Sequence, residues 1–158
     1  MNNYSQEAKQ IIADHIYMTI ATASKNGQPW ISPVFFAYDD KYNLYWVSYK
    51  NARHSSLIKD NPQVSIVIFN SQAPEGEGDG VYFEAEVEEI TENKEIQFAM
   101  NVLGKRVTKE EFRVKKVEEV TEEGAWRIYK AKPLKITKLS RGTTVNGQYI
   151  DERVEVSL

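Results

Sequence analysis

The chain has 158 residues, within the usual length of one domain, and 41% of them are hydrophobic and 27% charged. The net charge of −3 argues against a nucleic-acid binder that relies on bulk positive charge, and the absence of cysteine excludes disulfides, thiolate catalysis and cysteine metal sites. The N-terminus shows no signal-peptide pattern, and no segment approaches the ~20 apolar residues of a membrane span, so we expect a cytoplasmic protein without a membrane partner.

The first elements in the chain are a helix and a hairpin. Ser5 is placed to cap a helix over about 6–14, after which the hydrophobic period changes from helical to alternating near 16–21. Asn26-Gly27 predicts a two-residue hairpin turn, because both turn positions need a positive φ.

The middle of the chain alternates strands with one short helix. A second strand over about 28–38 is apolar on both faces, and since a barrel interior accounts for only one face, we expect a homodimer to cover the other. A third strand covers 44–49. A short helix over 52–60 ends at an Asn-Pro pair, and the β-branched run at 64–69 predicts a buried strand.

The second half begins with a Gly- and Glu-rich segment, 71–80, which we interpret as a mobile loop. A strand with one wet face follows over 81–88, and Thr91 and Thr108 are placed to cap two further helices. The alternating carboxylates of that strand, at Glu84, Glu86 and Glu88, are typical of a solvated strand face, so we assign them no catalysis.

The last long strand covers 126–139 and is interrupted at Pro133, which indicates an edge or a bulge. Asn146-Gly147 marks a final hairpin. Strands joined by short hairpins, with a few peripheral helices, predict a mostly β protein: one domain, 1–158, built on an antiparallel barrel of about six strands.

The turn after the third strand is the most informative part of the sequence. Asn51 is a good N-cap for the short helix, and Arg53 and His54 fall in its first turn, where positive side chains oppose the helix dipole. A bound phosphate would remove that conflict, since Ser48, Lys50 and Arg53 would then converge on one anion.

The alternative is that Lys50 and Arg53 are solvated or paired with acidic residues elsewhere, and the pattern alone does not separate the two. A lone histidine such as His54 is more often structural than a ligand. Two histidines without cysteine give no metal-ligand spacing, so no metal site is predicted. Trp30 and Trp46 are interpreted as core or interface aromatics.

Several segments, in order, resemble the pyridoxamine 5′-phosphate oxidase-like flavin-binding split-barrel superfamily, and among its members the small general-stress-protein type. The resemblance covers roughly residues 5–140. The segments that carry it are the strand at 16–24, Gly-Gln-Pro at 27–29, Pro-Val-Phe-Phe-Ala-Tyr at 33–38, Leu-Tyr-Trp-Val-Ser at 44–48, Arg53-His54, and Asp-Asn-Pro-Gln-Val-Ser at 60–65.

The resemblance implies a six-stranded split barrel that dimerises and holds flavin mononucleotide (FMN) at the subunit interface. Ser48 matches the family's phosphate-binding hydroxyl, Arg53 and His54 its basic pair, and Val47 a further contact. Trp126 matches loosely an aromatic residue near the cofactor. The flavin ring edge is expected along the second strand, through mostly backbone contacts from Ile31, Ser32, Pro33, Val34 and Phe36.

The departures from the family concern substrate rather than flavin. Ile31 and Phe36 stand where the true oxidase has Arg and Lys, so pyridoxamine phosphate oxidation is not expected. We expect a flavin-dependent oxidoreductase that acts on an unidentified small molecule or electron acceptor, with no catalytic residue assigned. The alternatives are a flavin-binding stress protein without turnover, or a split barrel that binds a deazaflavin or haem, for which His15 and His54 are the only imidazoles.

Overall fold

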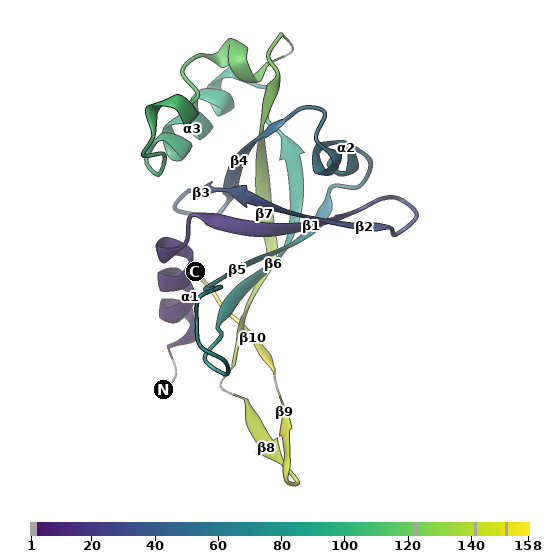
Figure 1. Cartoon of the computed structure of the whole chain (residues 1–158), viewed down its shortest axis with the longest axis vertical. Helices are drawn as coiled ribbons and strands as arrows, with labels where there is room; N and C mark the ends of the chain where they lie inside the picture. Colours follow the sequence, from purple (N-terminus) through teal and green to yellow (C-terminus); the bar gives the residue numbers. More distant parts are fainter. Residues whose placement is uncertain (1–2, 122, 141, 151) are drawn as a thin grey trace.

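A strongly curled antiparallel sheet forms the centre of the protein in the computed structural model, which describes residues 3–121, 123–140, 142–150 and 152–158 (Figure 1). The strands follow the order β2-β1-β5-β6-β7-β4-β3, and β10 is added beside β7. These strands are β1 (Tyr17–Ala23), β2 (Pro29–Phe35), β3 (Ala37–Tyr38), β4 (Leu44–Tyr49), β5 (Gln63–Phe69), β6 (Gly80–Glu89), β7 (Trp126–Leu139) and β10 (Arg153–Glu155).

Helices lie around the sheet, and a separate two-stranded hairpin projects from one end of it (Figure 1). The hairpin strands pair only with each other among the described residues. The helices are α1 (Tyr4–Asp14), α2 (Arg53–Asp60) and α3 (Asn93–Gly104), with 3-10 turns at Glu110–Phe112 and Val117–Val120, and the hairpin consists of β8 (Thr143–Val145) and β9 (Gln148–Ile150).

The sheet nearly closes on itself through a bend at Phe36. Before the bend, β2 pairs with β1, and after it β3 pairs with β4. The Phe36 amide donates to the Ile16 carbonyl at 3.1 Å, which fixes the bend against the start of β1. β4 pairs with β3 and not with β2, so β2 and β4 are not joined by hydrogen bonds. The sheet is therefore open between these two strands, and this opening makes the fold a split barrel.

The expectation of a mostly β split barrel is therefore confirmed, but the strand count is not. Within the described residues the curled sheet has eight strands rather than six. The predicted strand over 28–38 is broken into β2 and β3 by the bend, and the C-terminal β10 adds the other extra strand.

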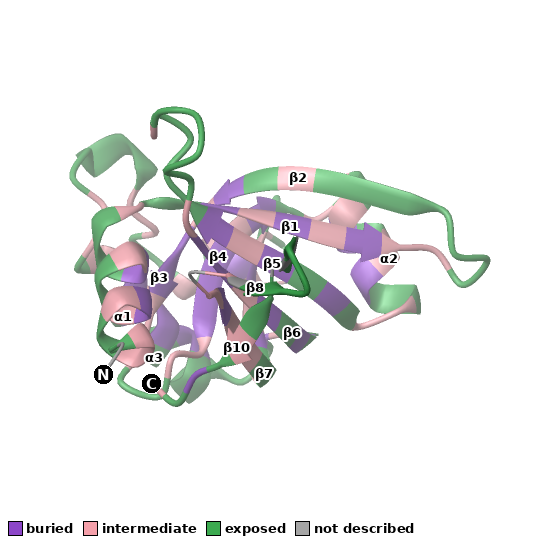
Figure 2. Cartoon of the chain, turned by 90° about the horizontal axis from the view of Figure 1, so that it is seen from below, coloured by how far each residue is buried: buried purple, intermediate pink, exposed green. Residues whose placement is uncertain are grey.

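Two hydrophobic clusters lie on the two faces of β4 and β7. Buried residues alternate with less buried ones along strands such as β1 (Figure 2). Alternate residues of β4 face the barrel interior, where Trp46 stacks on Tyr129 with ring centroids 5.5 Å apart. Tyr45 faces the other side and joins α3. Since Ser48 continues the Leu44–Trp46 row, the sequence brings its hydroxyl to the interior face at the end of the barrel.

α1 is held against the sheet by charged side chains at both ends. Lys138, only 3% exposed, forms ion pairs with Glu7 of α1 at 3.0 Å and with Asp79 at 2.6 Å. Arg106 donates to the carbonyls at the end of α1, including that of His15 at 2.6 Å. The segment 71–80, which we predicted to be a mobile loop, is therefore fixed near its end by the ion pair of Asp79 with Lys138.

The predicted helix caps are wrong by one or two positions. No side-chain cap forms at α2 or α3. At α1 the side chain of the N-cap residue accepts a hydrogen bond from the Gln6 amide. The residues predicted as caps were Ser5, Asn51 and Thr91, whereas the N-cap residues are Asn3, Ala52 and Glu92.

The predicted turns were partly correct. Asn146 and Gly147 both have positive φ, as their hairpin requires. In the first hairpin only Gly27 does, because a hydrogen bond from its amide to the Ser24 carbonyl makes a longer turn that ends in one left-handed residue. The β6–β7 register shifts opposite Pro133, which confirms the bulge. The helix expected after Thr108 is only the 3-10 turn Glu110–Phe112.

None of the helices within the described residues has the length and apolar content needed to cross a membrane.

Candidate functional site

The candidate site lies where β2 and β4 separate, beside α2 (Figure 1). β2 is an edge strand: among the described residues it pairs with β1 on one side and with no strand on the other. α2 contacts both β1 and β2. The side-chain amide of Asn61, directly after α2, donates from Nδ2 to the Ala23 carbonyl at 3.3 Å and fixes the helix against the end of β1.

Ser48 and His54 form the inner part of the site. The Ser48 hydroxyl, 6% exposed at the end of β4, lies 2.8 Å from Nε2 of His54 in the first turn of α2. Burial lowers the pKa of His54 below its usual value because it disfavours the charged imidazolium. The ring is therefore neutral at pH 7 in the chain alone.

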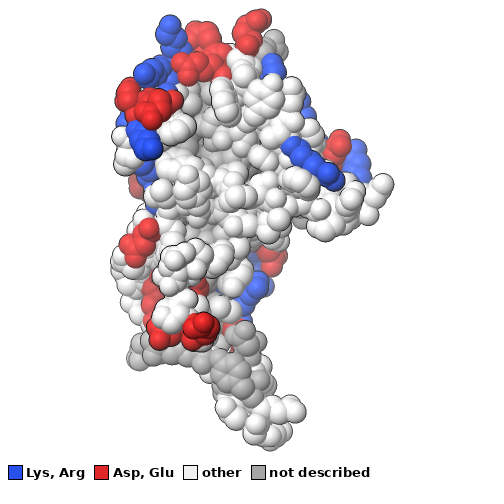
Figure 3. Space-filling view, viewed as in Figure 1, with Lys and Arg blue, Asp and Glu red and all other residues white. Residues whose placement is uncertain are grey.

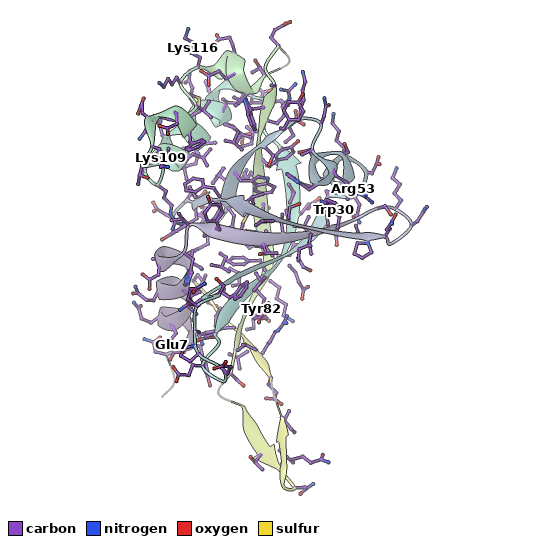
Figure 4. All side chains as sticks on the ribbon, in the orientation of Figure 1. Glu7, Trp30, Arg53, Tyr82, Lys109 and Lys116 are labelled. Carbon is purple, nitrogen blue, oxygen red and sulfur yellow. The ribbon has the colours of Figure 1, made fainter. Side chains whose placement is uncertain are left out.

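Arg53 and Trp30 form the outer part (Figure 4). The Arg53 guanidinium carbon lies 4.4 Å from the centroid of the Trp30 ring, and the Trp30 indole N–H donates to the Ser32 hydroxyl at 3.1 Å. Arg53 is exposed and has no carboxylate partner within the described part of the chain. Its positive charge therefore remains uncompensated.

The backbone N–H groups at the start of α2 have no side-chain cap. The first turn contains no acidic residue, and the N-cap residue, Ala52, offers no side-chain acceptor. Ser55 is turned away, since its hydroxyl donates to the Tyr49 carbonyl at 3.1 Å. Free N–H groups beside a serine, a histidine and an unpaired arginine are the elements of an anion-binding site. We refer to Trp30, Ser32, Ser48, Arg53 and His54 as the α2 cluster.

The predicted residues of the second strand divide between the two faces of β2. Ser32 and Val34 lie on the inner face, with Val34 in the barrel core, and Phe36 is fully buried at the bend. Ile31 and Pro33 are exposed on the outer face. The edge of β2 that does not pair with β1 has no strand partner among the described residues.

Three other predicted residues lie away from the α2 cluster. Val47 and Trp126 are on the outer face of the β4–β7 pair, where Trp126 meets Tyr49 edge to face at 5.9 Å. Lys50 lines a separate cavity to which Ser48, Arg53 and His54 do not contribute.

Trp30 is the member of the site that the sequence interpretation missed. It was assigned to a core or an interface, yet it supports Arg53. The signal was present: Trp30, Ser32 and Val34 alternate on one face of β2, and Val34 turns that face toward the barrel interior, where Ser48 is also buried.

The outer face of β1 and β2 carries almost no charge (Figure 3). By register, Tyr17 lies opposite Phe35, and their rings meet edge to face at 6.2 Å. Ile31 on the same face is 65% exposed. A broad uncharged surface of this kind on a polar protein is typical of a protein interface.

No group of three or more potential metal-ligating side chains comes together within the described residues. No metal centre is therefore assigned there.

A family model described as pyridoxamine 5′-phosphate oxidase matches residues 4–139. The chain belongs to this family, and the expected relationship is confirmed. No curated protein matches the sequence.

Solved structures show the same fold at low sequence identity. A haem-binding protein from Mycobacterium smegmatis is 17% identical with a TM-score of 0.72; the alignment covers 98% of this chain and 59% of that protein, so the chain spans less than two thirds of its length. The haem storage protein HutZ from Vibrio cholerae is 17% identical with a TM-score of 0.65, covering 84% of this chain and 91% of HutZ. An FAD-binding protein from Mesorhizobium loti is 18% identical with a TM-score of 0.62, and the alignment covers 85% of this chain and 92% of that protein.

Proposed function

We propose that the chain binds FMN at the α2 cluster and acts as a flavin-dependent oxidoreductase on a small molecule. The observation that carries the proposal is the uncompensated start of α2: free N–H groups, an unpaired Arg53, and a Ser48–His54 pair at 2.8 Å, with no carboxylate in the first turn. A phosphate is the group that this arrangement lacks.

Each residue of the cluster has a distinct task in holding a phosphate. The Ser48 hydroxyl donates to a phosphate oxygen and keeps His54 in position. Arg53 supplies positive charge and several N–H donors. Trp30 packs against the flat face of its guanidinium, so the N–H groups at the edge of the guanidinium stay available to a ligand. His54, neutral without ligand, gains a proton more easily beside a dianion, because the anion favours the charged imidazolium.

The flavin ring would lie along the free edge of β2, where backbone N–H and C=O groups have no strand partner in the part of the chain that the structure describes. The bound flavin supplies hydride-transfer chemistry. The backbone dipoles of β2 would orient the ring and stabilise negative charge that develops on it. Ile31 and Phe36, in place of a charged pair, argue against pyridoxamine phosphate as the substrate.

We propose further that a second copy of the chain completes the site. Trp30, Arg53 and His54 line neither of two cavities in the single chain, one beside Tyr45 and Phe98 and one beside Lys50 and Arg127, so a second copy would supply the wall that encloses the cluster. β2 contributes Trp30 and Ser32 to the cluster and Ile31 to the uncharged outer face of β1 and β2, which would be covered in a homodimer (Figure 3).

Absorbance spectroscopy and titration test the proposal directly. The purified protein should show flavin bands near ~450 nm, as free flavin chemistry dictates, or should acquire them on reconstitution with FMN. Isothermal titration should give tighter binding of FMN than of riboflavin, which lacks the phosphate. Equal affinity for the two ligands, or binding of neither, would contradict an anion site at α2.

Haem is the second candidate, since two of the similar structures are of haem proteins. One geometric feature favours it: Nδ1 of His15 lies 2.7 Å from the Ile11 carbonyl. A carbonyl only accepts, so Nδ1 carries the hydrogen and Nε2 keeps its lone pair, as in an iron-ligating histidine. A Soret band after haem addition that His15→Ala abolishes would favour this function over FMN.

A further inference from the structure

A second basic region lies on the other side of the turn that follows β4. It surrounds a cavity of about 380 Å³, at the lower end of the ~300–1,000 Å³ range of ligand pockets. We call it the lysine pocket, and the residues that define it are Lys50, Lys59, Glu89, Thr91, Thr121 and Arg127. It shares none of these residues with the α2 cluster.

The charges in the lysine pocket are unbalanced. Arg127 is held by Glu89, with Nε 3.0 Å from the carboxylate, so this pair is nearly neutral. Lys50 and Lys59 form no ion pair within the described part of the chain, and both line the same cavity. In a chain with a net charge of −3, two unpaired ammonium groups facing one hollow mark a place where an anion is attracted.

The walls of the lysine pocket are fixed by the fold. The Lys50 amide donates to the Ala125 carbonyl at 2.9 Å, which ties the turn to the start of β7. Lys59 is in the last turn of α2. Ile90 and Val120 also line the cavity, and because they are buried in the cluster beneath α3 they fix its floor. Little reorganisation is therefore needed when a ligand binds.

We propose that the lysine pocket binds the phosphate of a nucleotide-sized ligand, separately from the phosphate that we propose for the α2 cluster. Lys50 and Lys59 would hold the phosphate, and the hydroxyls of Thr91 and Thr121 would bond polar groups of the ligand. Such a phosphate belongs either to the adenylate half of a flavin dinucleotide or to a free mononucleotide.

Titration with AMP and with inorganic phosphate tests the proposal, on both FMN-free and FMN-saturated protein. AMP should bind the wild-type protein, and Lys50→Gln and Lys59→Gln should each weaken AMP binding about tenfold, the usual effect of losing one charge-assisted hydrogen bond. FMN affinity should stay within about twofold, since these residues lie outside the α2 cluster. Thermal melting of each variant checks that it is folded.

Two matched variants complete the experiment. Lys105→Gln removes the charge of an exposed lysine outside the pocket and should change neither affinity. Arg53→Ala should weaken FMN binding and leave AMP binding intact. If FMN does not bind at all while AMP binding still depends on Lys50 and Lys59, the lysine pocket stands and the proposed flavin function falls.

The source of the phosphate follows from competition. If the adenylate half of FAD fills the pocket, FAD binds more tightly than FMN, Lys50→Gln removes the difference, and AMP no longer binds the FAD-loaded protein. If AMP still binds to FAD-loaded protein, the ligand is a separate nucleotide. The proposal is overturned if neither AMP nor phosphate binds the wild-type protein at millimolar concentration, or if the lysine variants bind AMP as the wild type does.

Discussion

The guanidinium of Arg53 rests on the ring of Trp30, with 4.4 Å between the guanidinium carbon and the ring centroid. This partner matters because it is neutral. A carboxylate would cancel the charge of Arg53, whereas an aromatic face holds the side chain in place and leaves the charge available to a ligand. The first turn of α2 contains no acidic residue that would neutralise the charge of Arg53.

Arg53→Ala should weaken FMN binding about ten- to a hundredfold, because a charge-assisted hydrogen bond to the phosphate is lost. Riboflavin affinity should barely change, since that ligand has no phosphate. Isothermal titration of both ligands against both proteins measures the comparison.

Stability is the control for the Arg53 variant. Arg53 is exposed and its charge opposes the dipole of α2, so the melting temperature of the FMN-free protein should not fall. Loss of riboflavin and FMN affinity to the same extent would show that Arg53 is not the phosphate ligand.

The sequence predicted the positions of most strands along the chain, because alternation and turn residues are local signals. It failed at Phe36, where the chain continues as one apolar run but changes its pairing partner from β1 to β4. That change depends on closure of the barrel, a contact between residues far apart in the chain, and nothing in the run itself marks it.

The site was predicted in the same uneven way. Ser48, Arg53 and His54 were found because they are close in sequence to one helix start. Trp30 was missed because its contact with Arg53 joins β2 to α2, two elements that β3 and β4 separate in the sequence. The predicted cap at Asn51 was wrong because the helix begins later, at Arg53, which leaves the first turn without a side-chain cap.

Ile31→Glu should convert a dimer into a monomer. The Ile31 side chain is 65% exposed on the uncharged outer face, so the substitution leaves the barrel core intact but places a charge where a second copy would pack. Light scattering at micromolar concentration should give twice the chain mass for the wild type and the chain mass for the variant.

Phe112→Glu is the matched control for the dimer experiment, since Phe112 is 70% exposed on a 3-10 turn outside β1 and β2. This variant should remain a dimer. A wild-type protein that is monomeric at this concentration would contradict the proposed interface.

The stability of the FMN-free protein should depend on pH through His54. Its pKa is lowered in the folded chain by burial, so below the ordinary value of 6.5 the unfolded chain binds more protons than the folded one. The free energy of unfolding should therefore fall as the pH drops from 6.5 toward the lowered pKa and level off below it. This contribution is fully present above pH 6.5.

Urea denaturation between pH 5 and 8 isolates the effect when the wild type is compared with His54→Asn, which keeps a polar group near Ser48. The free energy of unfolding of the wild type should fall relative to that of the variant as the pH drops below 6.5. Parallel pH profiles of the two proteins would contradict the role of His54. With FMN bound the wild-type loss should be smaller, because the phosphate favours the protonated ring.

The segment 71–80 should tolerate shortening except at its end. Asp79 lies 2.6 Å from Nζ of Lys138, which is nearly inaccessible to solvent, and Glu7 is the other carboxylate on that ammonium. Asp79→Ala removes half of this pairing while Lys138 stays buried. Because Asp79 itself is partly solvated, we expect a loss of about 1–2 kcal/mol of folding free energy, less than for a fully buried pair.

For a chain of this length that loss corresponds to a fall of about 2–8 °C in Tm. Replacing residues 72–77 by a tight turn should change Tm by no more than about 2 °C, because the entropic cost of closing a loop depends only weakly on its length. Glu75→Ala, which removes an exposed carboxylate from the same loop, is the matched control and should leave Tm unchanged. If the protein with the shortened loop has a Tm as low as that of Asp79→Ala, residues of the loop other than Asp79 pack against the protein. The contact between Asp79 and Lys138 would then not be what orders the loop.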